Sequence, residues 1–253
     1  MDDGTLLARN LDGLNALIDL TGRAGYGAHV LERPGVRAAV CPGTPERSLW
    51  NFVVYETTDA LRDAHADLAA AYARAGVRAW TVWVPEDDVD ARDVLVPRGH
   101  VLDAAPAAMG VELAGVADEV AAEPEWTGDW SRWPEAVAVM DRAHGMAEGT
   151  AAAALGGLPA GSGHLYVADV DGAAASLVFV VDRGDDCVFA IAATAPEARG
   201  RGLVTGMLHR ALLDARARGC ATSTTQASRM GAPVYAGLGF RTVGTVQMWE
   251  RRR

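Results

Sequence analysis

The residues best suited to chemistry lie in a turn, residues 193–204, with the sequence Ala-Thr-Ala-Pro-Glu-Ala-Arg-Gly-Arg-Gly-Leu-Val. A strand-like run ends here, Pro196 breaks it, and a long helix-like segment begins at Leu203. The first N–H groups of a helix have no partner within the helix and lie at its positive end, so they favour an anion. Gly200 and Gly202 can adopt dihedral angles closed to other residues and leave room for a phosphate. The turn therefore predicts a phosphate-binding site.

Arginine supplies every basic side chain of this protein: all 23 Lys and Arg residues are Arg. A phosphate must then be held by Arg side chains and backbone amides, and Arg199 and Arg201 are the nearest candidates. The turn is neither the dinucleotide-binding G-x-G-x-x-G nor a P-loop, whose lysine and Ser/Thr are missing. On its own it could equally be an ordinary strand–helix turn.

A second group of residues follows 36 positions after Arg199, where the chain reads Tyr235-x-x-x-Gly239-Phe240. Together with Arg199-x-x-Gly202 and the helix after it, this pattern resembles the GNAT superfamily of acetyl-CoA-dependent N-acetyltransferases. The resemblance covers about residues 135–250 and includes, in the family's order, strand, Pro, pyrophosphate loop, long helix, strand, Tyr-bearing short helix, Gly-Phe and last strand. Val204 departs from the family's Gly or Ala, which implies looser phosphate contact or a shifted helix start.

The resemblance implies an acetyl-CoA site in this half of the chain. Backbone groups at the end of the strand would pair with the pantetheine arm, the loop would wrap the pyrophosphate, and the two arginines would reach the phosphates. The cofactor-binding residues implied are Ala192, Ala193, Thr194, Arg199, Gly200, Arg201, Gly202, Leu203, Val204, Thr205 and Ser228, the last at a position where many relatives carry Asn. Tyr235 would protonate the departing CoA thiolate, and packing of its ring beside Phe240 is the structural alternative.

The general base is not assigned by the resemblance. Some relatives place a glutamate twelve residues before the tyrosine, where this chain has Ser223. His144 and Glu148 are four residues apart and would share a face of the first helix of this half, and Gln226 could line the substrate cleft. Surface solvation explains these polar side chains equally well. The amine could also lose its proton through a water chain or arrive neutral.

The elements that position these residues follow the same order in both halves of the chain. In the first half we expect a helix within the first thirty residues, strands at 36–41, 49–55, 80–84 and 111–113, and helices at 59–75 and 87–93. In the second half we expect helices at 135–154, 203–218 and 232–236, and strands at 165–170, 175–181, 188–193, 222–227 and 241–250. Chance similarity between two Ala-rich halves is the alternative to a repeat.

The predicted fold class is α/β (α+β), with two tandem GNAT-like folds, each a mixed, mostly antiparallel sheet flanked by helices. The predicted domains are 1–117, a degenerate GNAT-like domain without a CoA loop; 118–133, a connector; and 134–253, an acetyl-CoA-binding GNAT domain. Trp126, Trp130 and Trp133 fall at helical spacing at the end of the connector, either as a ligand-stacking platform or as packing residues. In the first half, Glu56-Thr57-Thr58-Asp59 replaces the glycine loop and Leu95 replaces the tyrosine.

Charge and composition exclude several classes of function. The formal net charge is −10, and residues 1–120 carry most of it, which argues against a general nucleic-acid binder. No apolar stretch approaches a membrane span, so we expect no membrane contact and a cytoplasmic location. The three cysteines are widely spaced without C-x-x-C, so we expect neither a disulfide framework nor a metal site.

The sequence thus predicts an N-acetyltransferase that transfers an acetyl group from acetyl-CoA to a small amine by direct attack. The acidic first half would favour a cationic amine. Two alternatives stay open: a non-catalytic acyl-CoA-binding sensor or pseudoenzyme, and a protein N-acetyltransferase. We expect a monomer with pseudo-dimeric halves or a homodimer, and the sequence does not reveal the acceptor, the base or the acyl chain preference.

Overall fold

The computed structural model describes residues 1–119 and 123–253, so three residues of the predicted connector, 120–122, lie outside the described part. The described residues form two compact units. Unit 1 comprises residues 1–16, 108–152 and 159–243, and unit 2 comprises residues 17–107, 153–158 and 244–253. Each unit thus combines stretches from distant parts of the chain, whereas each predicted domain is one continuous stretch. The boundaries of the predicted domains stay a prediction.

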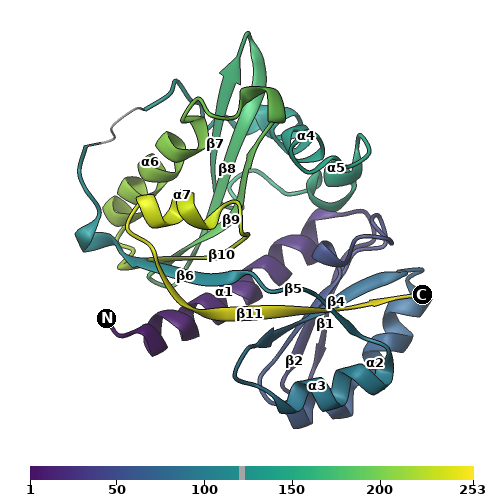
Figure 1. Ribbon diagram of the computed structural model, residues 1–253. Helices are drawn as coiled ribbons and strands as arrows, with labels where there is room; N and C mark the ends of the chain where they lie inside the picture. Colours follow the sequence, from purple (N-terminus) through teal and green to yellow (C-terminus); the bar gives the residue numbers. More distant parts are fainter. Residues whose placement is uncertain (120–122) are drawn as a thin grey trace. The chain divides into compact units, whose positions relative to one another are not determined.

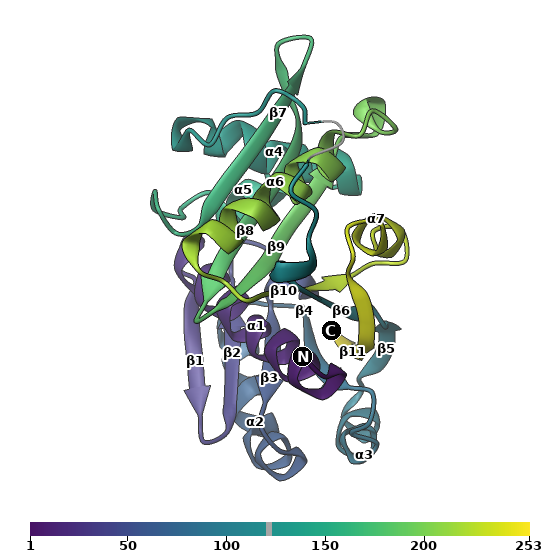
Figure 2. The same ribbon diagram turned by 90° about the vertical axis from the view of Figure 1, so that its left-hand side faces the viewer.

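Unit 1 is built on a sheet with the strand order β6-β10-β9-β8-β7. These strands are β6 (Ala107–Glu112), β7 (His164–Val170), β8 (Ala173–Arg183), β9 (Asp186–Thr194) and β10 (Thr222–Ala227). The antiparallel run β7-β8-β9 is followed by a parallel pair, β9 and β10. Its helices are α4 (Trp133–His144), α6 (Leu203–Arg218) and α7 (Ala232–Gly237), and α4 and α6 cover opposite faces of the sheet (Figures 1 and 2).

Four elements contribute residues to both units: α1 (Asp3–Ala24), α5 (Thr150–Leu155), β11 (Arg241–Arg252) and β6, of which Ala107 belongs to unit 2. A single helix predicted over 135–154 is wrong, because the chain forms α4 and α5 instead. Gly145 ends α4 with a left-handed φ of 61°. The buried carboxylate of Asp141 then accepts the N–H groups of Gly149 and Ala151, both at 2.8 Å, and so orders the start of α5.

Unit 2 is built on strands in the order β1-β2-β3-β4-β11, with β5 also paired to β11. The strands are β1 (His29–Arg33), β2 (Val36–Val40), β3 (Phe52–Tyr55), β4 (Ala79–Pro85) and β5 (Val101–Ala104), and the helices are α2 (Thr58–Arg74) and α3 (Asp90–Leu95). β3 and β4 are parallel, as β9 and β10 are in unit 1. The predicted strand 49–55 begins only at Phe52, because a 3-10 turn, Ser48–Trp50, precedes it.

The core of unit 2 contains a buried pair of histidines. His65 of α2 and His100 lie with their Nε2 atoms 3.0 Å apart, and both rings contact Trp80. His100 Nδ1 lies 3.0 Å from the carbonyl oxygen of Trp249. Because a carbonyl only accepts, His100 Nδ1 carries a proton, and its neutral Nε2 accepts the Nε2–H of His65. Burial lowers the pKa of His65 to about 3 and that of His100 to about 4, so both rings are neutral at pH 7.

This pair predicts that unit 2 loses stability in mild acid. In the unfolded chain these two histidines have the ordinary pKa of about 6.5, so below this pH they bind protons there while the folded rings stay neutral. The free energy of unfolding therefore falls as the pH drops. We expect a loss of about 2–4 kcal/mol between about pH 7 and pH 5. Urea unfolding should show about half of this loss in His65→Gln, and the full loss in the exposed control His29→Gln. An equal loss in His65→Gln and the unchanged protein would contradict the assignment.

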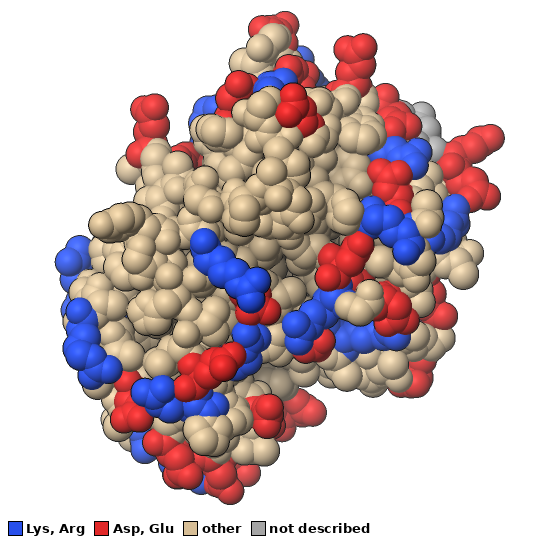
Figure 3. Space-filling view, turned by 180° about the vertical axis from the view of Figure 1, so that it is seen from behind, with Lys and Arg blue, Asp and Glu red and all other residues tan. Residues whose placement is uncertain are grey.

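Charged side chains of both signs are intermixed on the face shown in Figure 3, which also carries a wide area free of either sign. Within unit 2, arginines pair with carboxylates, as in Arg37–Asp19 at 2.7 Å and Arg33–Asp67 at 3.1 Å. Among the described residues, no helix is both long and apolar enough to span a lipid bilayer.

Candidate active site

The two parallel strands of unit 1 separate soon after they begin. β10 pairs with β9 only from Thr222 to Thr224, opposite Asp186 to Val188. β9 continues to Thr194 with β8 on one edge, and no described strand pairs with its other edge beyond Val188. The Thr225 hydroxyl contacts the carbonyl oxygen of Phe189 at 3.5 Å, where the strands part. The free edge of β9 can therefore hydrogen-bond to an extended ligand.

The first part of α1 supports β10 at this separation. The buried Asn10 side chain donates from Nδ2 to the carbonyl oxygens of Thr225, at 2.7 Å, and Met109, at 3.2 Å. Gly13 passes so closely that an added Cβ would lie 3.2 Å from a methyl group of Val188. Gln226 donates in turn to the backbone oxygen of Asn10 at 3.0 Å. The amide nitrogen of Gln226 is therefore engaged with α1, and its place in a substrate cleft stays a prediction.

The predicted phosphate-binding turn has the conformation that its glycines suggest. Gly200 and Gly202 have φ angles of 76° and 77°, and no atom lies within 4 Å of a Cβ added to either. Gly202 is the N-cap of α6, and no side chain caps this helix end. The helix begins at Leu203, as predicted, so Val204 does not shift its start. The turn thus presents uncapped amides at the positive end of a helix, with open space in front of them.

The two arginines of the turn differ in their surroundings. Arg199 donates to the carbonyl oxygens of Ala143, at 2.8 Å, and Thr194, at 3.3 Å, so its guanidinium ties the turn to α4 and to the end of β9. Two of its nitrogens therefore bond to the protein, and contact of Arg199 with phosphates stays a prediction. Arg201 is exposed and has no ion-pair or hydrogen-bond partner in the described part of the chain. Arg201 is therefore the arginine available to an anion.

His144 and Glu148 do not share a helix face, so that expectation is wrong. α4 ends at His144, and Glu148 lies in the exposed segment before α5. His144 directly follows Ala143, the residue that Arg199 binds. Partial burial and the Arg199 charge lower the pKa of His144, so its ring is neutral at pH 7.

The ring of Tyr235 in α7 packs as the structural alternative predicts, and proton donation by its hydroxyl stays a prediction. Its ring is buried and meets Phe240 and Phe189 edge-to-face, with centroids 5.2 and 6.0 Å apart. Burial raises the pKa of the Tyr235 hydroxyl to about 12, and a hydrogen bond with the Thr225 side chain opposes this only in part. The hydroxyl therefore keeps its proton at neutral pH, beside the residue where β10 leaves β9.

Other residues predicted at the site form contacts within unit 1 itself. The Ser228 hydroxyl accepts the N–H of Gly231 at 3.1 Å and so stabilises the turn before α7. Thr194 shares a 2.8 Å hydrogen bond with Ser176. Trp133 packs against Trp130 and Phe179 at centroid distances of 5.3 and 5.1 Å, so packing accounts for these connector tryptophans. Within the described ranges, no group of three His, Cys, Asp or Glu side chains could hold a metal ion.

A cavity of about 560 Å³ lies in unit 1 beside the start of α6. One face of α6 lines it with Gly202, Thr205, Gly206 and His209, and the end of α7 lines it at 237–239. The third side is the segment 115–119, where the Ala117 carbonyl oxygen lies 2.7 Å from His209 Nε2. The sequence analysis did not identify this cavity, although spacings of three, four and seven residues along a helix indicate a shared face.

Unit 2 lacks the corresponding features. The α2 N-terminus is capped by its own Thr57, whose side chain accepts the Ala60 N–H at 3.2 Å. Leu95, which stands in place of the tyrosine, is fully buried in the core. At these two corresponding positions of unit 2, the helix end is therefore capped and a core leucine stands in place of the tyrosine.

No protein-family model and no curated protein matches this sequence. The structure is similar to a GCN5-related N-acetyltransferase from Kribbella flavida, with a TM-score of 0.66, 16% identity, and 94% of this chain and 95% of that chain covered. A GCN5-related N-acetyltransferase from Sphaerobacter thermophilus gives a TM-score of 0.60 at 14% identity, covering 86% and 76%. A tandem GNAT protein from the clavulanic acid biosynthesis pathway gives 0.58 at 15% identity, covering 95% of each chain. These likenesses confirm the predicted architecture: the chain has the fold of GCN5-related N-acetyltransferases, in its tandem form.

Proposed function

We propose that this protein is an acetyl-CoA-dependent N-acetyltransferase that acts on a small amine, and that unit 1 carries its site. The observation that carries the proposal is the separation of β9 from β10, with a free strand edge that leads to an uncapped helix end. The fold likeness supports the same reading but identifies no substrate. Acetyl-CoA is proposed because its extended pantetheine arm matches the free edge of β9, and its diphosphate matches the uncapped start of α6.

The residues present fit this cofactor. The amides at the start of α6 and the Arg201 guanidinium would bind the diphosphate, since the glycine turn leaves them open to solvent. The β9 edge at Ala192, Ala193 and Thr194 would pair with the pantetheine arm and polarise a carbonyl placed there. Acetyl-CoA, when bound, supplies the activated acetyl group.

Two side chains would handle protons. Tyr235 holds a proton at its hydroxyl, which suits a donor to a departing thiolate. His144 is the proposed acceptor of the amine proton, because its lowered pKa leaves an unprotonated nitrogen at pH 7. His144 directly follows Ala143, whose carbonyl oxygen accepts a hydrogen bond from Arg199 of the glycine turn.

A specific observation favours a second candidate, a non-catalytic acyl-CoA sensor. Arg199 and Gln226, two residues expected to touch ligands, bond instead to the protein. A sensor would need binding but no proton transfer.

One pair of measurements separates these functions. We expect calorimetry to show acetyl-CoA binding with a Kd of about 1–100 μM, within the range usual for enzyme substrates. A thiol-release assay against pools of small amines and a matched pool of peptides should then show CoA release with amines. Binding without release from either pool would favour the sensor, and release with peptides alone would favour a protein acetyltransferase. No binding would refute the site itself.

A further inference from the structure

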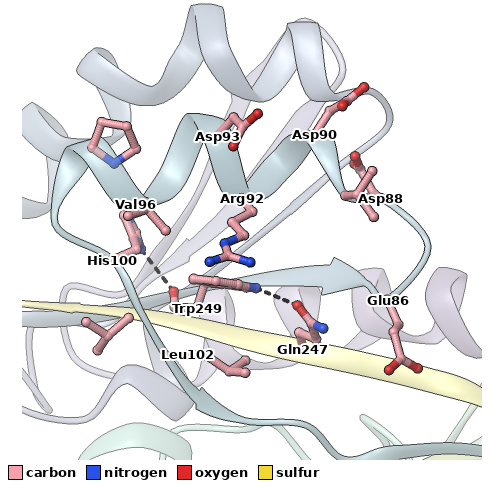
Figure 4. Close-up of a pocket in the computed structure, with 13 residues that line it drawn as sticks. Glu86, Asp88, Asp90, Arg92, Asp93, Val96, His100, Leu102, Gln247 and Trp249 are labelled. Carbon is pink, nitrogen blue, oxygen red and sulfur yellow. Dashed lines mark hydrogen bonds between the residues drawn. The ribbon is translucent and has the colours of Figure 1, made fainter.

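Unit 2 has a large groove that the proposed transferase site does not use. It lies between α3, β5 and the end of β11, encloses about 1130 Å³, and has Trp249 and Gln247 at its floor (Figure 4). Trp249 Nε1 donates to Gln247 Oε1 at 2.8 Å, which fixes the two side chains together. We call this the α3–β5 groove.

Apolar side chains are exposed around the α3–β5 groove. Val89 and Val96 flank α3 and are 72% and 48% exposed, and Val101 and Leu102 of β5 are 63% and 49% exposed. Aliphatic side chains of this size are among those most often buried in folded proteins. Four of them gathered on one groove mark a surface suited to an apolar partner.

The backbone of β5 adds hydrogen-bonding capacity to the groove. β5 pairs with β11 along one edge, and no strand of the described chain pairs with its other edge. All four of its residues, Val101–Ala104, are exposed. A free strand edge of this kind is a template for an added strand.

The charge of the groove is acidic and largely unpaired. Glu86, Asp90 and Asp93 line it and have no ion-pair partner in the described ranges. Arg92 is the one basic residue of the lining, and it points toward Trp249 rather than toward these carboxylates (Figure 4). Elsewhere in unit 2, Asp19 and Asp67 form ion pairs with Arg37 and Arg33, whereas the three carboxylates of the groove have no such partner among the described residues.

We propose that the α3–β5 groove binds an extended, basic segment of a partner protein, which adds to β5 as a further strand. Alternate side chains of such a strand point to opposite faces. Apolar residues on one face of the added strand would contact the exposed apolar side chain of β5 on that face, Val101 or Leu102, while Arg or Lys residues on the other face would meet Glu86, Asp90 and Asp93. A second copy of this chain fits poorly, because a symmetric pairing of two β5 edges would bring the same acidic groups together.

The test uses the full chain and a fluorescent hexapeptide of alternating Arg and Val, measured by anisotropy at low salt. We expect binding that weakens about tenfold in the variant Glu86→Gln/Asp90→Asn/Asp93→Asn, as expected when about three exposed ion pairs are lost. The matched control Asp59→Asn/Asp63→Asn/Asp67→Asn removes the same charge from α2 and should bind within about twofold of the unchanged protein. Circular dichroism verifies that both variants are folded.

Three further results would overturn the proposal. Equal binding of a peptide with Glu in place of Arg would remove the charge argument. Equal binding of two peptides, one N-methylated at every Arg and one at every Val, would remove strand addition, because one of the two lacks the N–H donors that face β5. Concentration-dependent dimers in sedimentation, abolished by Leu102→Lys, would assign the groove to a second copy. Each readout is a binding or assembly measurement, so it stands apart from any failure of the transferase proposal.

Discussion

Replacing Gly202 by glutamate is expected to abolish acetyl-CoA binding while the protein stays folded. Gly202 is the N-cap of α6 with a φ of 77°, and open space lies in front of it. A glutamate there would place a negative charge beside the proposed diphosphate position, where like charges cost several kcal/mol. We expect the Kd for CoA to rise about 100-fold or more, equivalent to about 2.7 kcal/mol. Isothermal calorimetry measures it directly.

The matched control for this variant is Gly172→Glu. Gly172 lies in the turn between β7 and β8, with a φ of 79° and nothing within 4 Å of an added Cβ. Both substitutions therefore strain the backbone equally and add the same charge, at a cost of about 1–2 kcal/mol of stability each. CoA affinity should fall only in Gly202→Glu. Unchanged affinity in that variant would show that the anion binds elsewhere.

Replacing Tyr235 by phenylalanine is expected to reduce turnover about 100-fold, the lower end of what a positioned proton donor contributes. The ring contacts with Phe189 and Phe240 do not involve the hydroxyl, so packing and CoA affinity should be nearly unchanged. Because the pKa of Tyr235 is raised to about 12, turnover in the unchanged protein should not fall through loss of this proton up to about pH 10. Steady-state rates and a CoA titration test both points.

Tyr166→Phe serves as the control for the loss of a buried tyrosine hydroxyl. Tyr166 of unit 1 donates to Asp214 at 2.9 Å, and burial together with this carboxylate raises its pKa. Its removal should cost about 0.5–1.5 kcal/mol of stability, as in Tyr235→Phe, without a change in rate. Equal rates for Tyr235→Phe and the unchanged protein would remove Tyr235 from proton transfer.

Local signals in the sequence account for the elements around the proposed site. The predicted helix 203–218 and strand 222–227 match α6 and β10 at both ends. The helix could be located because Gly202 and Gly219 flank it as N-cap and C-cap, and an apolar stripe runs along it. The spacing from Arg199 to Tyr235 reflects one strand and two helices in fixed order. Such features depend on neighbours in sequence and can be inferred from it.

The errors arise where distant residues decide the structure. The Ala-rich run 151–154 favours a helix continuous with α4, and only the capping of α5 by Asp141 shows the break. β5 was not predicted, because its four exposed residues carry no alternating pattern. The hydrogen bonds of Arg199 to carbonyl oxygens of α4 and β9 were likewise not foreseen, because spacing along the sequence does not reveal such partners.

Asn10 is a site-supporting residue that the sequence analysis missed. It lies four residues from both Leu6 and Leu14, in the buried stripe of α1, and a polar residue in such a stripe needs a hydrogen-bond partner. That signal was available, but the partners, Met109 and Thr225, are 99 and 215 residues away in the chain. Their identity requires the fold.

The interleaved composition of the two units has a consequence for synthesis on the ribosome. Unit 1 draws on residues from 1 to 243, and unit 2 is completed only by Gly244–Arg253, a stretch that includes most of β11. Domains that are continuous in sequence can fold one after another during translation. Here unit 2 cannot acquire its last strand before the C-terminal residues have left the exit tunnel, so a chain truncated before Arg241 would present the sheet of unit 2 without β11 to the cell's chaperones and proteases.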